Sequence, residues 1–167
     1  MQPYERASLV PAIRPYELDP ALIQMYHAFG LDTNRKSNLE FVDEKGSEPI
    51  IAYVAGNSLI LLHVPSMKRQ YIFGLGRSGI GSFVVHPSRE TLAIGEKGKF
   101  PNVYIYEYPS LNVVKILRNG AVRGYACMCY SANGRKLATV SSSPDYMLSI
   151  WDWENEQMLL QSKVHLP

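Results

Sequence analysis

The amino-acid sequence predicts an all-β fold, a β-propeller of which this chain forms only a part. Three observations lead to this prediction: the composition, an internal repeat, and the order of strands and turns within each copy of the repeat. Of the 167 residues, 46% are hydrophobic and 19% are charged, a balance that suits a packed core. Eleven Tyr, five Phe and two Trp favour strands, because aromatic side chains fit a pleated, half-buried surface. The net charge of +2 is too small to indicate a nucleic-acid or membrane binder by itself.

The repeat is visible when the second half of the chain is compared with itself. Leu92-Ala93 corresponds to Leu137-Ala138, and Ile105-Tyr106-Glu107 corresponds to Ile150-Trp151-Asp152, both at an offset of 45 residues. An earlier copy that starts at Leu61 matches the run from Ile105 at an offset of 44 residues. A period of about 40–45 residues is the size of one four-stranded blade of a WD-type propeller.

Each copy divides into short strands separated by turn residues. In the last copy, Asn133-Gly134 predicts a tight primed hairpin turn, and the third strand ends on Trp151-Asp152, the dipeptide that names WD repeats. The strands expected in this copy span residues 126–131, 136–141, 146–153 and 158–163. Those expected in the preceding copy span 82–85, 92–95, 103–108 and 113–117, and the first copy has 50–54, 58–64 and 70–73.

These strands predict a partial blade over residues 46–80 and further blades over 81–120 and 121–167, about two and a half to three in total. Closed propellers have at least about four blades, so this chain is not expected to close a ring. Residues 1–45 are expected to be an extended, proline-containing segment with a possible first strand. Alternate apolar residues favour a strand near 23–29, because the first sheet needs a partner for its edge, although a short helix fits the same residues.

Motifs for catalysis, metals and cofactors have simpler structural explanations. Cys127 and Cys129 lie two residues apart on an expected strand, with no second Cys/His pair at a zinc spacing. Ser141-Ser142-Ser143 lacks a nucleophile-elbow pattern. Gly74–Gly79 matches Gly-x-Gly-x-x-Gly, but a strand is expected after it where a dinucleotide site needs a helix. No metal spacing links the four histidines, His27, His63, His86 and His165. We therefore expect no enzyme, no catalytic residue, no cofactor and no metal.

Two loops, 96–102 and 141–145, are the candidate partner-binding sites because their lengths and prolines set them apart. The candidate contact residues are Glu96, Lys97, Lys99, Asn102, Ser143 and Asp145. Basic residues scatter over several loops with acidic residues between them, which favours a solvated rim over a nucleic-acid site. These basic residues are Lys97, Lys99, Lys115, Arg118, Arg123, Arg135 and Lys136. A protein partner is therefore expected, and a small-molecule, nucleic-acid or membrane partner is not.

The run from Glu96 to Leu111 resembles the cilia- and flagella-associated WD-repeat proteins, and the run from Ser142 to Trp153 resembles the next blade of that family. The resemblance implies a large non-catalytic protein of the cytoskeleton in motile cilia and flagella, with a coiled coil in full-length relatives. It implies an axonemal tether complex that links dynein to the doublet microtubule, with the complex, a dynein arm or tubulin as partner. The chain would be an N-terminal fragment or short isoform. The alternative is a generic cytosolic WD-repeat adaptor outside cilia.

The sequence also departs from generic WD repeats. Trp151-Asp152 occurs in the last copy, and Tyr106-Glu107 stands in its place in the preceding one; these four residues are the expected structural signature of the blades. No Gly-His dipeptide precedes the strands at Phe83 or Cys127. We therefore expect the buried His–Ser/Thr–Trp–Asp hydrogen-bond network to be absent and the blades to be held mainly by apolar packing.

Overall fold

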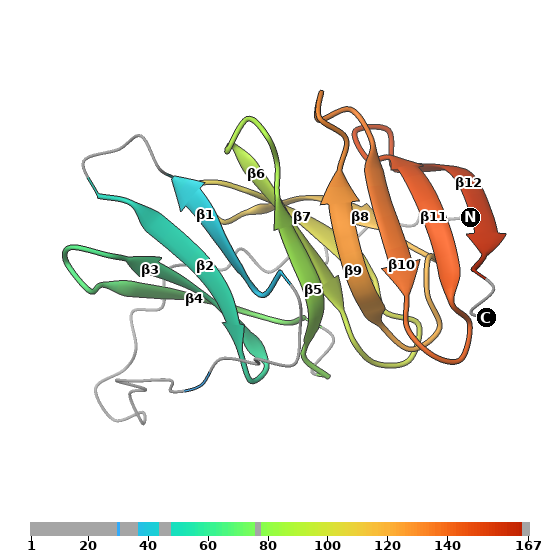
Figure 1. The fold of residues 1–167 in the computed structure, drawn as a ribbon, viewed down its shortest axis with the longest axis horizontal. Helices are drawn as coiled ribbons and strands as arrows, with labels where there is room; N and C mark the ends of the chain where they lie inside the picture. Colours follow the sequence, from blue (N-terminus) through green and yellow to red (C-terminus); the bar gives the residue numbers. More distant parts are fainter. Residues whose placement is uncertain (1–29, 31–36, 44–47, 76–77, 165–167) are drawn as a thin grey trace, which may run out of the picture.

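The computed structural model describes residues 30, 37–43, 48–75 and 78–164. The described residues form twelve β-strands in three antiparallel four-stranded sheets, in which each strand pairs with the next along the chain (Figure 1). The first blade contains β1 (Leu39–Asp43), β2 (Ile50–Ala55), β3 (Ser58–His63) and β4 (Arg69–Phe73). The second contains β5 (Ile80–Val85), β6 (Thr91–Glu96), β7 (Val103–Glu107) and β8 (Val113–Leu117). The third contains β9 (Tyr125–Tyr130), β10 (Leu137–Ser141), β11 (Met147–Asp152) and β12 (Gln157–Lys163).

The sequence repeat is preserved in the strand boundaries. β9 begins and ends 45 residues after β5, and β8 begins and ends 44 residues after β4. An irregularity in strand pairing also recurs: the register between the third and fourth strands shifts at Ile105/Tyr106 in the second blade and at Ile150/Trp151 in the third. A β-bulge bends a strand and increases its local twist, so the two outer hairpins share one distortion.

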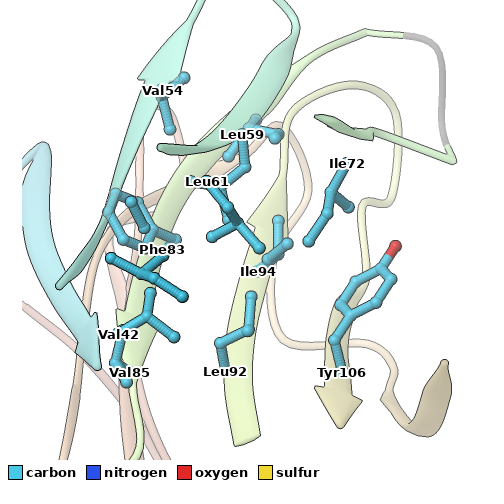
Figure 2. Close-up of a cluster of buried hydrophobic side chains, with 13 residues drawn as sticks. Val42, Val54, Leu59, Leu61, Ile72, Phe83, Val85, Leu92, Ile94 and Tyr106 are labelled. Atoms are coloured by element: carbon cyan, nitrogen blue, oxygen red, sulfur yellow. The ribbon is translucent and has the colours of Figure 1, made fainter. Parts of the chain in front are cut away.

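Apolar cores lie between consecutive blades. Successive side chains of a strand point to opposite faces of its sheet, so the second blade contributes to both cores. On β5, Phe83 and Val85 belong to the core shared with the first blade, whereas Val84 belongs to the core shared with the third. Figure 2 shows Leu59 and Leu61 of the first blade near Phe83 and Ile94 of the second. Burial between sheets, and not within one sheet, therefore holds the blades together.

Strand β1 completes the first blade, which the sequence predicted only in part. It pairs with β2, and its Val42 side chain is fully buried in the first core. The described residues thus form three complete blades, at the upper end of the predicted range, and the prediction of an all-β, unclosed WD-type propeller is confirmed. The strand expected within residues 23–29 lies outside the described residues. No helix among the described residues is long and apolar enough to cross a membrane.

The turn between β9 and β10 differs from the primed turn predicted for Asn133-Gly134. Of these two residues only Gly134 has a positive φ, 72°, and its N–H donates a hydrogen bond to the carbonyl of Ser131 at 2.8 Å. The second blade has the same turn 45 residues earlier, where Arg89 has φ 65° and its N–H donates to the carbonyl of His86 at 2.8 Å. In both blades the turn thus spans four residues, 86–89 and 131–134, in place of the expected two-residue turn.

Candidate partner-binding surface

The Trp-Asp signature of the third blade is structural. Trp151 is 1% exposed, and its indole Nε1 donates a hydrogen bond to Thr139 Oγ1 at 3.0 Å. The prediction that the His–Ser/Thr–Trp–Asp network is absent was therefore wrong in part, because its Thr–Trp hydrogen bond is present in the third blade. Next to it, Lys136 Nζ donates to Asp152 Oδ2 at 3.1 Å, and this hydrogen bond is the main cause that lowers the pKa of Asp152 below its usual range.

The second blade replaces this hydrogen bond by apolar contact, as the sequence predicted. Tyr106 takes the place of Trp151, and Ile94, 45 residues before Thr139, has no hydroxyl to accept a hydrogen bond. Burial, with a smaller contribution from the charge of Glu96, raises the pKa of the Tyr106 phenol. Glu107 is exposed and accepts a hydrogen bond from Ser110 Oγ at 2.6 Å, so it shapes the following turn.

The two loops selected from the sequence, 96–102 and 141–145, lie at the same end of the sheets, and a third loop between them is hydrogen-bonded to both. We call residues 97–102, 118–124 and 142–146 the three-loop surface; they connect β6 to β7, β8 to β9 and β10 to β11. Gly98 N–H donates to the carbonyl of Arg123 at 2.9 Å, and Ser142 N–H donates to the carbonyl of Gly124 at 2.8 Å. The middle loop is therefore fixed by backbone hydrogen bonds to both of its neighbours.

An aromatic side chain projects from this fixed backbone. Phe100 is 63% exposed, although its N–H donates a hydrogen bond to the carbonyl of Val122 at 2.9 Å. Its φ is 51°, in the left-handed region that bulky residues rarely adopt, and such strain persists only where the surroundings enforce it. Val122 beside it is 38% exposed, and Lys99 Nζ lies 5.8 Å from the centroid of the Phe100 ring. The surface thus displays an apolar pair in one defined position.

Positive charge surrounds the apolar pair. Lys97, Lys99, Arg118 and Arg123 are all exposed in these three loops. Asp145 is the only carboxylate in the three loops, and its Oδ2 accepts a hydrogen bond from Val122 N–H at 3.1 Å. The interpretation that basic residues scatter around the molecule was therefore incomplete. Four of the seven gather here, while Lys115 lies in β8 and Arg135 and Lys136 lie near the turn between β9 and β10.

The structure assigns different positions to the other candidate contact residues. Glu96 is only 3% exposed, so the expectation that its side chain contacts a partner was wrong. Asn102 is half-buried and closes its hairpin, because its carbonyl accepts from Glu96 N–H at 3.1 Å and its Nδ2 donates to Tyr104 Oη at 3.2 Å. Ser143 is exposed. Sequence reasoning missed Phe100 and Val122, although an aromatic residue between Lys99 and Pro101 was a visible signal.

The remaining motifs occupy structural positions. Gly74–Gly79 connects β4 to β5, so the motif leads directly into a strand and not into a helix that would receive a pyrophosphate. Cys127 and Cys129 are exposed free thiols on the same face of β9. Within the described parts of the chain, no group of three or more His, Cys, Asp or Glu side chains is placed to hold a metal ion.

Three four-stranded meanders at a 44- to 45-residue period, one of them closing on a buried Trp followed by Asp, define a WD-repeat propeller segment. No family model matches the chain. It is 37% identical over 161 residues to "Cilia- and flagella-associated protein 44" of Mus musculus, an alignment that covers 96% of this chain and 8% of the relative. The Chlamydomonas reinhardtii protein of the same name is 40% identical over 147 residues, covering 84% of this chain and 8% of the relative.

A more distant relative is "Echinoderm microtubule-associated protein-like 2" of Rattus norvegicus, 28% identical over 124 residues and 68% of this chain. The chain belongs to the cilia- and flagella-associated WD-repeat proteins. It spans about 8% of the length of the first two relatives. The comparisons confirm the predicted family, whose matched members are named as cilia- and flagella-associated proteins.

Proposed function

We propose that this chain is a non-enzymatic scaffold segment of the axoneme in motile cilia and flagella, and that its three-loop surface binds a protein partner. The observation that carries the proposal is the exposed, strained Phe100 within a set of loops fixed by hydrogen bonds, in a member of a ciliary family. Loops that a rigid scaffold holds in place often carry binding residues. At a finer level, we propose that the partner belongs to a complex that tethers dynein to the axoneme, with tubulin as a further candidate.

The side chains considered for chemistry have structural roles, which supports a scaffold. Ser141 Oγ accepts a hydrogen bond from Met147 N–H at 2.7 Å and is thereby bound to the backbone of the next strand. His86 Nε2 lies 3.1 Å from the carbonyl oxygen of Gly134, and its ring makes edge contacts with Tyr130 and Trp153. This histidine therefore joins the second blade to the third.

A retention experiment in ciliated cells tests the proposal. The tagged chain is expressed, and axonemes are separated from soluble protein. We expect the wild type in the axonemal fraction, and we expect Lys97→Glu/Lys99→Glu to shift to the soluble fraction because the change reverses two charges of the three-loop surface. Lys68→Glu/Arg135→Glu is the matched control, because both residues are exposed in turns at the other end of the sheets.

Two outcomes would contradict the proposal, one for the ciliary scaffold and one for the three-loop surface. Loss of the wild type from axonemes would favour the generic cytosolic adaptor and refute the ciliary scaffold. Retention of Lys97→Glu/Lys99→Glu at the wild-type level would show that the contact lies elsewhere on the chain.

A further inference from the structure

We infer that the three-loop surface recognises a short acidic peptide segment that contains one aromatic or large aliphatic residue. The inference rests on the proposed function and specifies the chemistry of the partner. Two independent features support it: an exposed apolar pair at a fixed position, and a concentration of positive charge around that pair. The first selects an apolar anchor, and the second selects the acidic residues that flank the anchor.

The apolar pair has the properties of an anchor site. Phe100 and Val122 come from different loops, and a hydrogen bond of 2.9 Å from Phe100 N–H to the Val122 carbonyl fixes their backbones next to each other. Asp145 fixes Val122 in turn, through the hydrogen bond from Val122 N–H to its Oδ2. Because this backbone is already ordered, a partner that covers Phe100 does not have to order the loops, which removes a major cost of binding. Aromatic residues, Phe included, are also enriched in protein–protein interfaces.

The charge distribution selects an acidic partner. Four exposed cations lie in the three loops, and the single carboxylate there is engaged with a backbone N–H. The opposite end of the sheets is mixed in charge: exposed cations lie there at Lys68 and Arg135, and exposed glutamates lie there in turns or, for Glu107, at the end of β7. These glutamates are Glu90, Glu107, Glu154 and Glu156. An acidic segment would therefore be attracted to the end of the molecule that carries the three loops. Such complementarity fixes orientation and speeds association more than it adds affinity, so the apolar anchor is needed as well.

A peptide fits these features better than a single-stranded nucleic acid. Proteins that bind single strands use several stacking aromatics along a charged groove. Here Phe100 is the one exposed aromatic in the three loops, all of whose residues the structure describes, and Tyr146 is half-buried. One anchor surrounded by cations corresponds to a short linear motif.

Fluorescence anisotropy with the purified chain tests the inference. The probe is a labelled glutamate-rich peptide with one central phenylalanine, and the comparison probes are the same peptide with serine in place of phenylalanine and an oligouridine of equal charge. We expect the phenylalanine peptide to bind about tenfold more tightly than the serine peptide. Its affinity should fall with rising salt, because exposed charges are screened.

Variants identify the surface. Phe100→Ser should abolish the preference for the phenylalanine peptide, and Val122→Ser should reduce it. Lys97→Glu/Lys99→Glu should weaken both acidic peptides, whereas the control Lys68→Glu/Arg135→Glu should bind as the wild type does. Circular dichroism checks that each variant is folded, and Val122→Ser retains the backbone carbonyl that accepts the hydrogen bond from Phe100 N–H.

Equal affinity for the two peptides, or an unchanged preference in Phe100→Ser, would overturn the anchor. Tighter binding of oligouridine than of either peptide would show that the surface recognises a nucleic acid and not a peptide. If the chain prefers the phenylalanine peptide but the wild type is not retained in axonemes, the proposed function is overturned and the inferred peptide specificity stands. Retention without peptide preference overturns the inference alone.

Discussion

Replacing Trp151 by Phe and Thr139 by Val, singly and together, measures the hydrogen bond that the sequence did not predict. Both side chains are buried, with exposures of 1%, and the donor and acceptor are 3.0 Å apart. Each single change leaves a buried polar group without its partner, which costs about 1–3 kcal/mol of unfolding free energy. The double variant removes both groups, so this cost largely disappears. We therefore expect a coupling free energy of about 1–2 kcal/mol between the two sites.

Urea denaturation followed by circular dichroism measures these free energies without relying on tryptophan fluorescence. Trp153 provides the control, because its indole Nε1 donates to the backbone carbonyl of Gly134 at 2.7 Å and not to Thr139. The cycle of Trp153→Phe with Thr139→Val should therefore be additive. Trp151→Ala, which removes the whole ring from the core, should cost about 3–5 kcal/mol. Additivity within about 0.5 kcal/mol in the Trp151–Thr139 cycle would refute the hydrogen bond as a contributor to stability.

Three further changes test other parts of the structure. A Cβ atom on Gly81 would lie 2.4 Å from the carbonyl oxygen of Tyr125, so Gly81→Ala should lower the unfolding free energy measured by urea denaturation by about 1–3 kcal/mol. Gly124→Ala is the control and should cost less, because its Cβ would meet nothing closer than 3.4 Å. Equal costs would contradict the close approach of β5 and β9. Burial is the main cause that raises the pKa of Glu40 above its ordinary value of 4.5. The folded state therefore binds this proton more tightly than the unfolded state does. As a result, the stability of the wild type falls as the pH rises from 4.5 toward the higher pKa of the folded state. Glutamine does not titrate, so Glu40→Gln does not lose stability in this way. The unfolding free energy of the variant minus that of the wild type should therefore increase from pH 4 to pH 7; a pH-independent difference would be inconsistent with the raised pKa. Leu160 is 53% exposed in β12 of the third blade and should promote self-association of the purified chain. Leu160→Glu should therefore lower the mass measured by light scattering toward 18.8 kDa; a wild type that is already monomeric would disprove this.

The sequence by itself determined the repeat, the strands and the family. Strand positions follow from local patterns, namely alternating apolar residues bounded by turn residues, and these patterns recur at a constant period in the chain. For this reason the predicted strand at residues 113–117 coincides with β8, and most other predicted boundaries differ from the observed ones by one or two residues. Burial of Trp151 follows from the same pattern, because the repeat places it on the face that meets the preceding blade.

Only the tertiary structure decided which side chains meet. Thr139 and Trp151 come together through the register of β10 and β11, which a search for the usual Gly-His signature does not reveal. The loops around Phe100 and Val122 converge because the second and third blades pack side by side, which brings together residues that are far apart in the chain. Glu96, the last residue of β6, lies on the same face as Leu92 and Ile94 and is buried toward the first blade, whereas Phe100 in the loop that follows is exposed. Local propensity depends on neighbours in the sequence, whereas a binding surface depends on sheet register and blade packing, and these are fixed only when the whole core forms.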